Sequence, residues 1–165
     1  MEIREVRPEE HEETGRVTVA AYQEFVDPAV EGWDGYLRLL ADVAGRAART
    51  VVLVAVDGGR VIATATIELD DVVGDDDEAL PADTSALRML GVLPEARGRG
   101  VARALMDEVI GRVRAAGKRV LILRTTDLMA AAQALYASMG FERATELDIQ
   151  VTENFTLLGF RLPLG

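Results

Sequence analysis

A glycine-broken segment in the second half of the chain most constrains how it can fold. Residues 92–105 read VLPEARGRGVARAL: an apolar stretch, a turn that holds Gly98 and Gly100, and a helix-forming stretch. Glycine lets the backbone bend with no Cβ in the way, so that several N–H groups can point to one side. The helix that follows adds the partial positive charge of its N-terminus. The segment therefore predicts a strand, a turn and a helix that together bind a phosphate group.

Length and composition predict one domain over residues 1–165. The chain has 165 residues, 49% of them hydrophobic, and no internal repeat or linker-like segment interrupts it. It has no cysteine, which excludes disulfides, thiolate nucleophiles and thiolate metal ligands. Its single histidine, His11, lies among glutamates, so we expect no metal site.

The chain is acidic, with a formal net charge of −10. Binding to nucleic acid or to an anionic membrane requires clusters of Lys and Arg, so neither partner is expected. The charge is compatible with a cationic small-molecule substrate. No apolar run reaches the length of a membrane span, and we expect the protein in the cytoplasm.

Hydrophobic periodicity predicts an α/β fold with a mixed, largely antiparallel central sheet of about seven strands and about four helices. The clearest unit is a hairpin whose two strands flank the turn residues Asp57-Gly58-Gly59. The expected strands cover residues 1–6, 50–56, 61–69, 86–93, 120–123, 146–151 and 155–162. One expected helix begins at Pro8, and the others cover residues 35–48, 100–116 and 127–139. The last two strands either close the sheet of one chain or form a homodimer.

The turn does not match the common nucleotide-binding motifs. A dinucleotide fingerprint would need a third glycine where Arg103 stands, and a P-loop would need a terminal GK[ST]. The turn matches the pattern R/Q-x-x-G-x-G/A over residues 97–102 instead. A second motif, ALYASMGF, follows at residues 134–141.

With both motifs in this order, the sequence resembles the GNAT family of N-acetyltransferases. The resemblance covers the whole chain in element order and is specific over residues 86–141. It implies the acyl-CoA N-acyltransferase fold, in which the sheet opens after the motif strand and acetyl-CoA enters the gap as co-substrate. The backbone of Leu90 and Val92 would pair with the pantetheine, and N–H groups of residues 97–102 would hold the pyrophosphate. The implied cofactor-binding residues are Leu90, Gly91, Val92, Arg97, Gly98, Arg99, Gly100, Val101 and Ala102.

The resemblance also implies direct attack of an amine on the thioester, without a covalent enzyme intermediate. Tyr136 stands at the tyrosine position of the family and would act as general acid toward the departing thiolate. The alternative is an aromatic side chain that only packs on the apolar face of its helix, with Leu128, Ala132 and Leu135.

Glu68 is the candidate general base. It lies near the end of the hairpin strand beside the motif strand, where related enzymes often place an acid that acts through water. The alternative is a solvated acid at a strand end, beside Asp70 and Asp71. A backbone N–H near Leu90 to Val92 would polarise the thioester carbonyl.

One residue departs from the family pattern. The family often has an asparagine about seven residues before the tyrosine, and Met129 stands there, so this contact is lost or shifted to Thr126 or Gln133. We therefore expect an N-acetyltransferase that acts on a primary amine of a small molecule or peptide. The alternative is a domain that binds acyl-CoA without turnover, as a sensor or interaction module. The acidic loop of residues 70–83 either attracts a cationic amine or is simply solvated.

Overall fold

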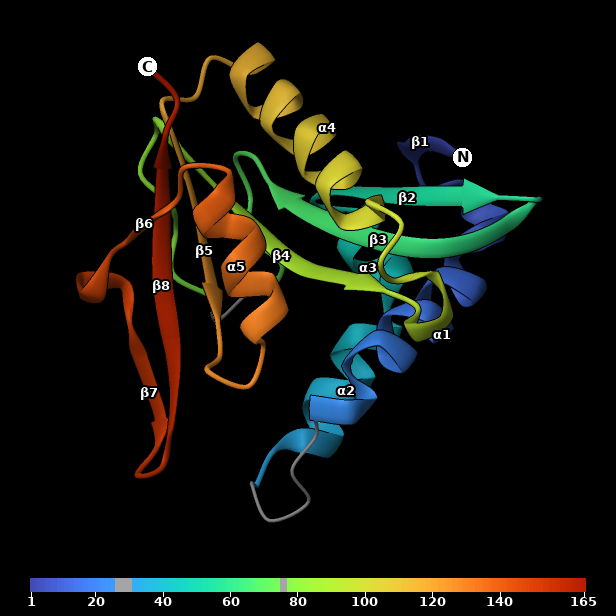
Figure 1. Ribbon diagram of the computed structural model, residues 1–165, viewed down its shortest axis with the longest axis horizontal. Helices are drawn as coiled ribbons and strands as arrows, with labels where there is room; N and C mark the ends of the chain where they lie inside the picture. Colours follow the sequence, from blue (N-terminus) through green and yellow to red (C-terminus); the bar gives the residue numbers. More distant parts are fainter. Residues whose placement is uncertain (26–30, 75–76) are drawn as a thin grey trace.

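The computed structural model describes residues 1–25, 31–74 and 77–165. Its eight strands form a sheet in the order β1-β2-β3-β4-β5-β8-β6, with β7 paired to β8 (Figure 1). Among the described strands, only the β4–β5 pair is parallel. The mixed, largely antiparallel sheet expected from the sequence is confirmed.

The helices and strands follow one another in nearly the predicted order. The strands are β1 (Glu2–Glu5), β2 (Val51–Asp57), β3 (Arg60–Glu68), β4 (Thr84–Val92), β5 (Val120–Thr125), β6 (Glu142–Arg143), β7 (Ile149–Thr152) and β8 (Phe155–Pro163). The α-helices are α1 (His11–Tyr22), α2 (Trp33–Ala41), α3 (Val43–Ala47), α4 (Val101–Ala115) and α5 (Ala130–Ser138). Short 3-10 turns cover Pro8–Glu10, Gln23–Phe25, Pro94–Ala96 and Thr145–Leu147.

The helix expected over residues 35–48 is divided into α2 and α3. The break lies at Asp42, whose φ of −84° and ψ of 72° leave the helical region. Its carboxylate accepts a hydrogen bond from the N–H of Gly45 (3.0 Å) and so caps the start of α3. A short acidic side chain competes for backbone N–H groups in this way, which ends one helix and starts the next.

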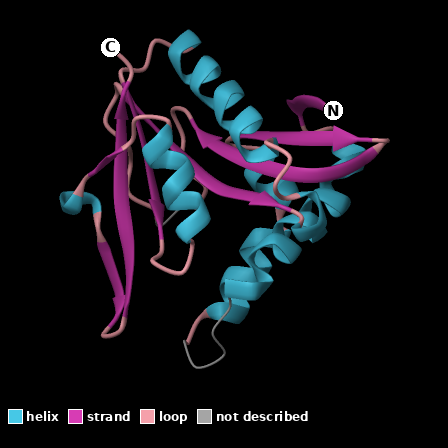
Figure 2. Cartoon of the chain, viewed as in Figure 1, coloured by secondary structure: helices cyan, strands magenta, loops and turns pink. Residues whose placement is uncertain are grey.

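Helices cover both faces of the sheet (Figures 1 and 2). The apolar stripe of α4, which includes Leu105, Met106 and Val109, is fully buried in the core. On the other face, α1 contacts β3 and β4. Gly91 of β4 lies against Ala21 of α1 and pairs with Thr64 of β3. Because alternate residues of a strand share a face, the α1 side of the sheet also carries Thr66 and Glu68.

A β-bulge in β4 separates the two halves of the sheet. Between the pairs Thr64–Gly91 and Thr66–Arg88, two residues of β4 stand opposite one residue of β3. One of the two is Met89, whose φ of 55° lies in the left-handed region. On its other edge, β4 pairs with β5 only from Thr84 to Ala86, whereas β5 continues to pair with β8 as far as Thr125. β4 and β5 therefore diverge beyond Ala86.

The C-terminal strands close the sheet of the chain itself. β8 lies between β5 and β6 and also pairs with β7. Its Phe160 and Leu162 are buried in the common core. A homodimer through these strands stays a prediction. No helix in the described ranges is both long and apolar enough to cross a membrane.

The close packing of α1 on β4 can be tested at Gly91. An alanine there would place its Cβ 2.7 Å from the Cβ of Ala21, so that α1 or β4 must shift. We expect Gly91→Ala to lower the free energy of unfolding by about 1–3 kcal/mol in urea denaturation. Gly111→Ala is the control, because no described atom lies within 4 Å of the added Cβ in the middle of α4. It should raise stability by about 0.5–1 kcal/mol, and a similar change in both variants would contradict this packing.

Candidate active site

The glycine turn leaves a group of backbone donors free at the start of α4. Gly98 and Gly100 have φ values of 76° and 77°, and Gly100 is the residue that precedes the helix. The first N–H with a partner here is that of Ala104, which donates to the carbonyl of Gly100 (3.0 Å). Within the described part of the chain, the N–H groups of residues 98–103 donate no hydrogen bond. This is the arrangement that binds anions at a helix N-terminus.

The two arginines of the turn face other parts of the protein. Arg97 donates from Nη2 to the carbonyl of Ala21 (3.1 Å) and from Nε to the carbonyl of Val92 (3.2 Å), and it pairs with Glu24. Its own N–H donates to the carbonyl of Pro94, so it is not among the free donors. The Arg99 side chain pairs with Asp57 of the hairpin (2.7 Å) and lowers the pKa of that carboxyl. Both side chains hold the turn in place, and its free donors come from the backbone.

The open edge of β4 carries the backbone of Leu90 and Val92. The N–H of Leu93 donates to the carbonyl of Ile62 on β3 (2.9 Å). Because backbone groups alternate along a strand, those of Val92 and Leu90 point away from β3. The Leu90 carbonyl accepts a hydrogen bond from the hydroxyl of Tyr22 (3.0 Å), and the Val92 carbonyl accepts the one from Arg97. Gly91 turns the other way and serves the close approach of α1.

A small cavity of about 40 Å³ lies where β4 and β5 diverge. β4 and β5 form two of its walls, and α5 with the residue that precedes it forms a third. The lining residues are Tyr22, Leu87, Met89, Leu90, Leu123, Arg124, Thr125, Met129, Ala132 and Tyr136. The cavity lining includes Leu90 on the open edge of β4 and Tyr136, the tyrosine of the second motif.

Tyr136 is buried at this cavity, with 5% of its surface exposed. Its ring packs against Phe141 (5.5 Å between centroids) and Phe160 (6.5 Å). The alternative neighbour Leu128 is exposed instead. Burial raises the pKa of the Tyr136 hydroxyl, so the phenol stays protonated at neutral pH. The side chain therefore packs in the core and also presents a phenol at the cavity.

Glu68 is buried, with 5% of its surface exposed, and is not a solvated acid at a strand end. Its Oε2 accepts a hydrogen bond from the N–H of Val73 (2.6 Å) and lies 3.9 Å from Nη1 of Arg88. Burial raises the pKa of the Glu68 carboxyl, while the Val73 N–H and the Arg88 charge act against this shift. Glu68 lies on the α1 side of the sheet and does not line the cavity that holds Tyr136.

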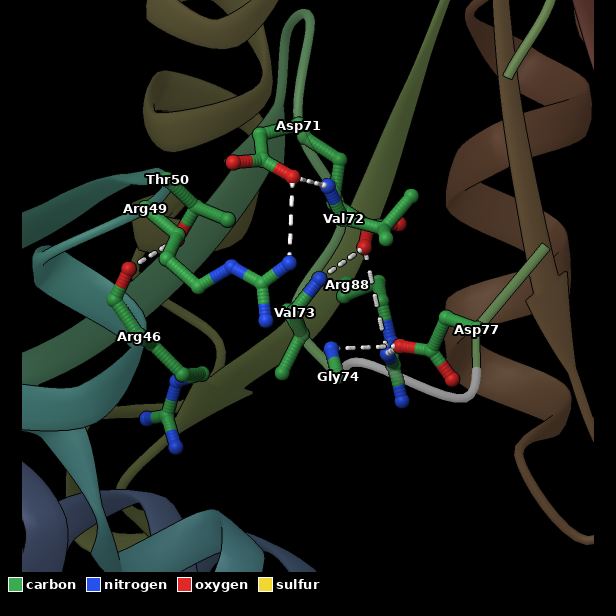
Figure 3. A network of polar contacts seen from close by, with 10 residues as sticks. Arg46, Arg49, Thr50, Asp71, Val72, Val73, Gly74, Asp77 and Arg88 are labelled. Carbon is green, nitrogen blue, oxygen red and sulfur yellow. Dashed lines mark hydrogen bonds and ion pairs between the residues drawn. The ribbon is translucent and has the colours of Figure 1, made fainter. Parts of the chain in front are cut away.

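Three carboxylates of the acidic loop form ion pairs. Asp70 pairs with Lys118 (2.6 Å), Asp71 with Arg49 (3.3 Å), and Asp77 with Arg88 (2.9 Å; Figure 3). Asp75 and Asp76 of this loop lie outside the described residues. These pairs reduce the negative charge that was expected to attract a cationic amine. Among the described residues, no group of three or more His, Asp or Glu side chains could hold a metal ion.

The structure adds Tyr22, which the sequence did not indicate, to the site and shows what Met129 does there. Tyr22, at the last turn of α1, lines the cavity opposite α5, and no motif points to it. Met129 also lines the cavity and accepts a hydrogen bond from Thr125 through its Sδ (3.3 Å). Gln133 is committed to the carbonyl of Thr126 (2.8 Å). Where the family often has an asparagine, the cavity wall is therefore formed by the thioether of Met129.

The family model described as the acetyltransferase (GNAT) family matches residues 11–141. The chain belongs to this family. The match includes the glycine turn, the bulged strand and the motif of Tyr136, and it confirms the resemblance stated from the sequence. The family also gives the enzyme class expected from the sequence, an acetyltransferase.

Known proteins of the family are similar to this GNAT chain over different lengths. An N-acetylaspartate synthetase from Danio rerio is 39% identical over 83 residues, which are 50% of this chain and 28% of that protein. The ribosomal-protein-S18-alanine N-acetyltransferase of Escherichia coli superposes with a TM-score of 0.70 at 20% identity, covering 99% of this chain and 94% of that one. The Salmonella typhimurium protein yncA, solved with acetyl-CoA, gives a TM-score of 0.69 at 22% identity and covers 100% and 94%. The two structures show the fold.

The role of the free N–H groups can be tested at Gly100. Gly100→Ala meets no described atom within 4 Å, but it places a Cβ at a left-handed residue, at a cost of about 1–2 kcal/mol. We expect it also to weaken the binding of CoA at least tenfold in calorimetry, because the Cβ enters the anion site. Gly117→Ala is the matched control, with a φ of 78° and open space at the other end of α4. Equal CoA affinity in the two variants would rule out the turn as the pyrophosphate site.

Proposed function

We propose that this protein transfers the acetyl group of acetyl-CoA to a primary amine of a small molecule or peptide, by direct attack of the amine. One observation carries the proposal: the open edge of β4 leads from the free N–H groups of residues 98–103 to the cavity at Tyr136. The pyrophosphate would bind the turn, and the pantetheine would run along Leu90 and Val92. The thioester would then lie where β4 and β5 diverge.

Tyr136 is proposed to act on the departing sulfur as general acid. Its phenol is protonated at neutral pH and lies at the cavity. A thiol has a pKa of about 8.5, well below that of a buried phenol. Full transfer of the proton is therefore uphill, and a hydrogen bond from Tyr136 to the developing thiolate does much of the stabilisation. A backbone N–H near Leu90 to Val92 would polarise the thioester carbonyl.

Glu68 is proposed to remove the proton from the amine. The attacking amine must be neutral, and a carboxylate whose pKa is raised by burial is a stronger base than an ordinary one. Glu68 lies outside the cavity lining, so it would act through water, as the resemblance implies. Because Glu68 is buried on the α1 side of the sheet, we expect the acceptor on that side as well.

A second candidate function is binding of acyl-CoA without turnover. Two observations favour it: Met129 replaces the usual asparagine, and Glu68 does not line the cavity. Against it stand the protonated phenol at the cavity and the enzyme class of the family. The Danio rerio relative is named for an N-acetylated amino acid, which supports transfer to an amine.

An assay of acetyl-CoA turnover with a panel of amines, in which the release of free CoA is measured, separates the two candidate functions. We expect at least one amine to be acetylated and Tyr136→Phe to lower kcat by about 10²-fold or more. The same variant should leave the dissociation constant for CoA within about twofold, because the ring still packs on Phe141 and Phe160. CoA binding with no acetylated amine would support the sensor, and an unchanged kcat would exclude Tyr136 as the acid.

Glu68→Gln tests the base and carries a pH signature. We expect kcat to fall by about 10²-fold at neutral pH and the rise of rate with pH through the Glu68 pKa to disappear.

The folded-state pKa of Glu68 is raised, so between its ordinary and its raised pKa the folded protein binds more protons than the unfolded one. Its unfolding free energy therefore decreases as pH rises through that window, and urea denaturation of the variant should lack this slope. The exposed Glu9→Gln is the control, and loss of the slope with normal turnover would leave Glu68 only a structural role.

A further inference from the structure

Arg46 is a buried cation whose hydrogen bonding is incomplete. It lies in α3 with 1% of its surface exposed. Its Nη1 donates to the carbonyls of Leu39 (2.5 Å) and Leu40 (3.0 Å), at the C-terminal end of α2. Its Nε and Nη2 are buried and have no partner in the described part of the chain. Leaving charged donors buried and unpaired is costly, so this edge of the guanidinium requires an explanation.

No described carboxylate forms an ion pair with Arg46. Asp42 is the nearest acid in sequence, but its carboxylate caps the N–H of Gly45. Asp77 and Glu68 face Arg88 instead. Burial lowers the pKa of the Arg46 guanidinium and the charge of Arg88 adds to this effect, while Asp42 opposes it. The protein thus keeps a cation inside without giving it a bonded counter-ion.

Arg46 faces the side of the sheet that the acceptor is proposed to use. Its charge interacts with Arg88 and with the hydroxyls of Tyr22 and Tyr36. Tyr22 in turn lines the cavity of Tyr136. In Figure 3, the guanidinium groups of Arg46 and Arg88 extend to the same side, toward the bottom of the view. α3, which carries Arg46, contacts α1, and the ring of Tyr22 contacts that of Tyr36 (6.5 Å between centroids), so Arg46 belongs to the layer of helices that covers this face of the sheet.

Other unpaired groups on this face are hydrogen-bond donors as well. Thr66 is fully buried, its hydroxyl has no partner among the described residues, and it stands opposite Arg88 in the pairing of β3 with β4. The Nε1 of Trp33 in α2 is also buried without a described partner, and its ring contacts Tyr36 (5.7 Å). A guanidinium, an indole N–H and a hydroxyl can all donate to oxygen. Together they fit an acceptor that carries an anionic oxygen group.

We propose that the amine acceptor also carries a carboxylate, and that the Nε and Nη2 of Arg46 bind it. These two nitrogens form one edge of the guanidinium, which matches the two oxygens of a carboxylate in a bidentate contact. The inference rests on the proposed function and narrows its substrate class to amino acids and acidic peptides. This edge is enclosed, so the proposal requires a local shift of α2 to admit the carboxylate. Trp33, the only tryptophan, lies in α2 and would report that shift.

The first test compares matched acceptors on the unmodified protein. The probes are L-alanine, L-aspartate, L-glutamate and β-alanine, each beside its carboxamide, and the peptide amides Asp-Gly-NH2 and Asn-Gly-NH2. Both members of a pair offer the same amine and differ in a carboxylate. We expect kcat/KM to be at least tenfold higher for the carboxylate in at least one pair. Equal values in every pair that is acetylated would overturn the proposal.

The second test assigns the preference to Arg46. We expect Arg46→Gln to bring the ratio within that pair close to one, mainly by raising KM for the acid, and Arg46→Lys to keep part of it. Loss of the bonds to Leu39 and Leu40 alone would lower kcat/KM for both members alike, so the ratio separates binding from a structural role. Arg16→Gln, an exposed residue of α1 paired with Glu12, is the control. A folded Arg46→Gln protein that keeps the full ratio would overturn the proposal.

Direct binding separates this inference from the proposed function. If CoA binds but no amine is acetylated, the transferase proposal fails, and Trp33 fluorescence is titrated with the same acids and amides in the presence of CoA. A change with an acid and not with its amide, lost in Arg46→Gln, supports a carboxylate site without turnover. No difference between acids and amides in that titration overturns it.

Discussion

The divergence of β4 from β5 is the constraint on which the rest of the site depends. It requires Met89 in a left-handed conformation, which costs of the order of 1–2 kcal/mol. Contacts with α1 offset this cost: Gly91 lets the helix approach, Tyr22 donates to the Leu90 carbonyl, and Arg97 bridges Val92 to Ala21. The strand edge is thus held open from the α1 side, while its N–H groups stay available toward the gap.

The way the protein uses its cations explains how an acidic chain can bind an acidic cofactor. Arg97 and Arg99 are already paired, so in the proposed site the pyrophosphate would be attracted by backbone N–H groups and the N-terminus of α4. Such dipoles add no net charge and need no counter-ion. Arg46 does the opposite: it brings a full charge into the interior and leaves one edge unpaired. The donor and acceptor sides are therefore built on different physical principles.

The glycine turn and the start of α4 were predictable from sequence because they are local. The type of turn, the two left-handed glycines and the start of α4 all follow from residues within one short segment. The β-bulge was not predictable from the sequence, since Met89 and Leu90 continue an apolar strand pattern that gives no sign of a changed register. Arg46 reads as an ordinary polar residue of a helix, and for Glu68 the sequence left open a general base or a solvated acid at a strand end. Their burial is decided by α1, α2 and the loop after β3, which pack against them from distant parts of the chain.

This division bears on how the acceptor is recognised. The proposed donor site is formed by backbone groups, so we expect side-chain substitutions around it to change CoA binding mainly where they add a Cβ to the anion site or disturb α1. The proposed acceptor site would instead depend on side chains of α2, α3 and β4. Arg46 caps the end of α2 with Nη1, while its other edge stays unpaired. A ligand bound at that edge would be sensed directly by the end of α2. Under the proposal, recognition of the acceptor and the position of α2 are coupled, because one guanidinium takes part in both.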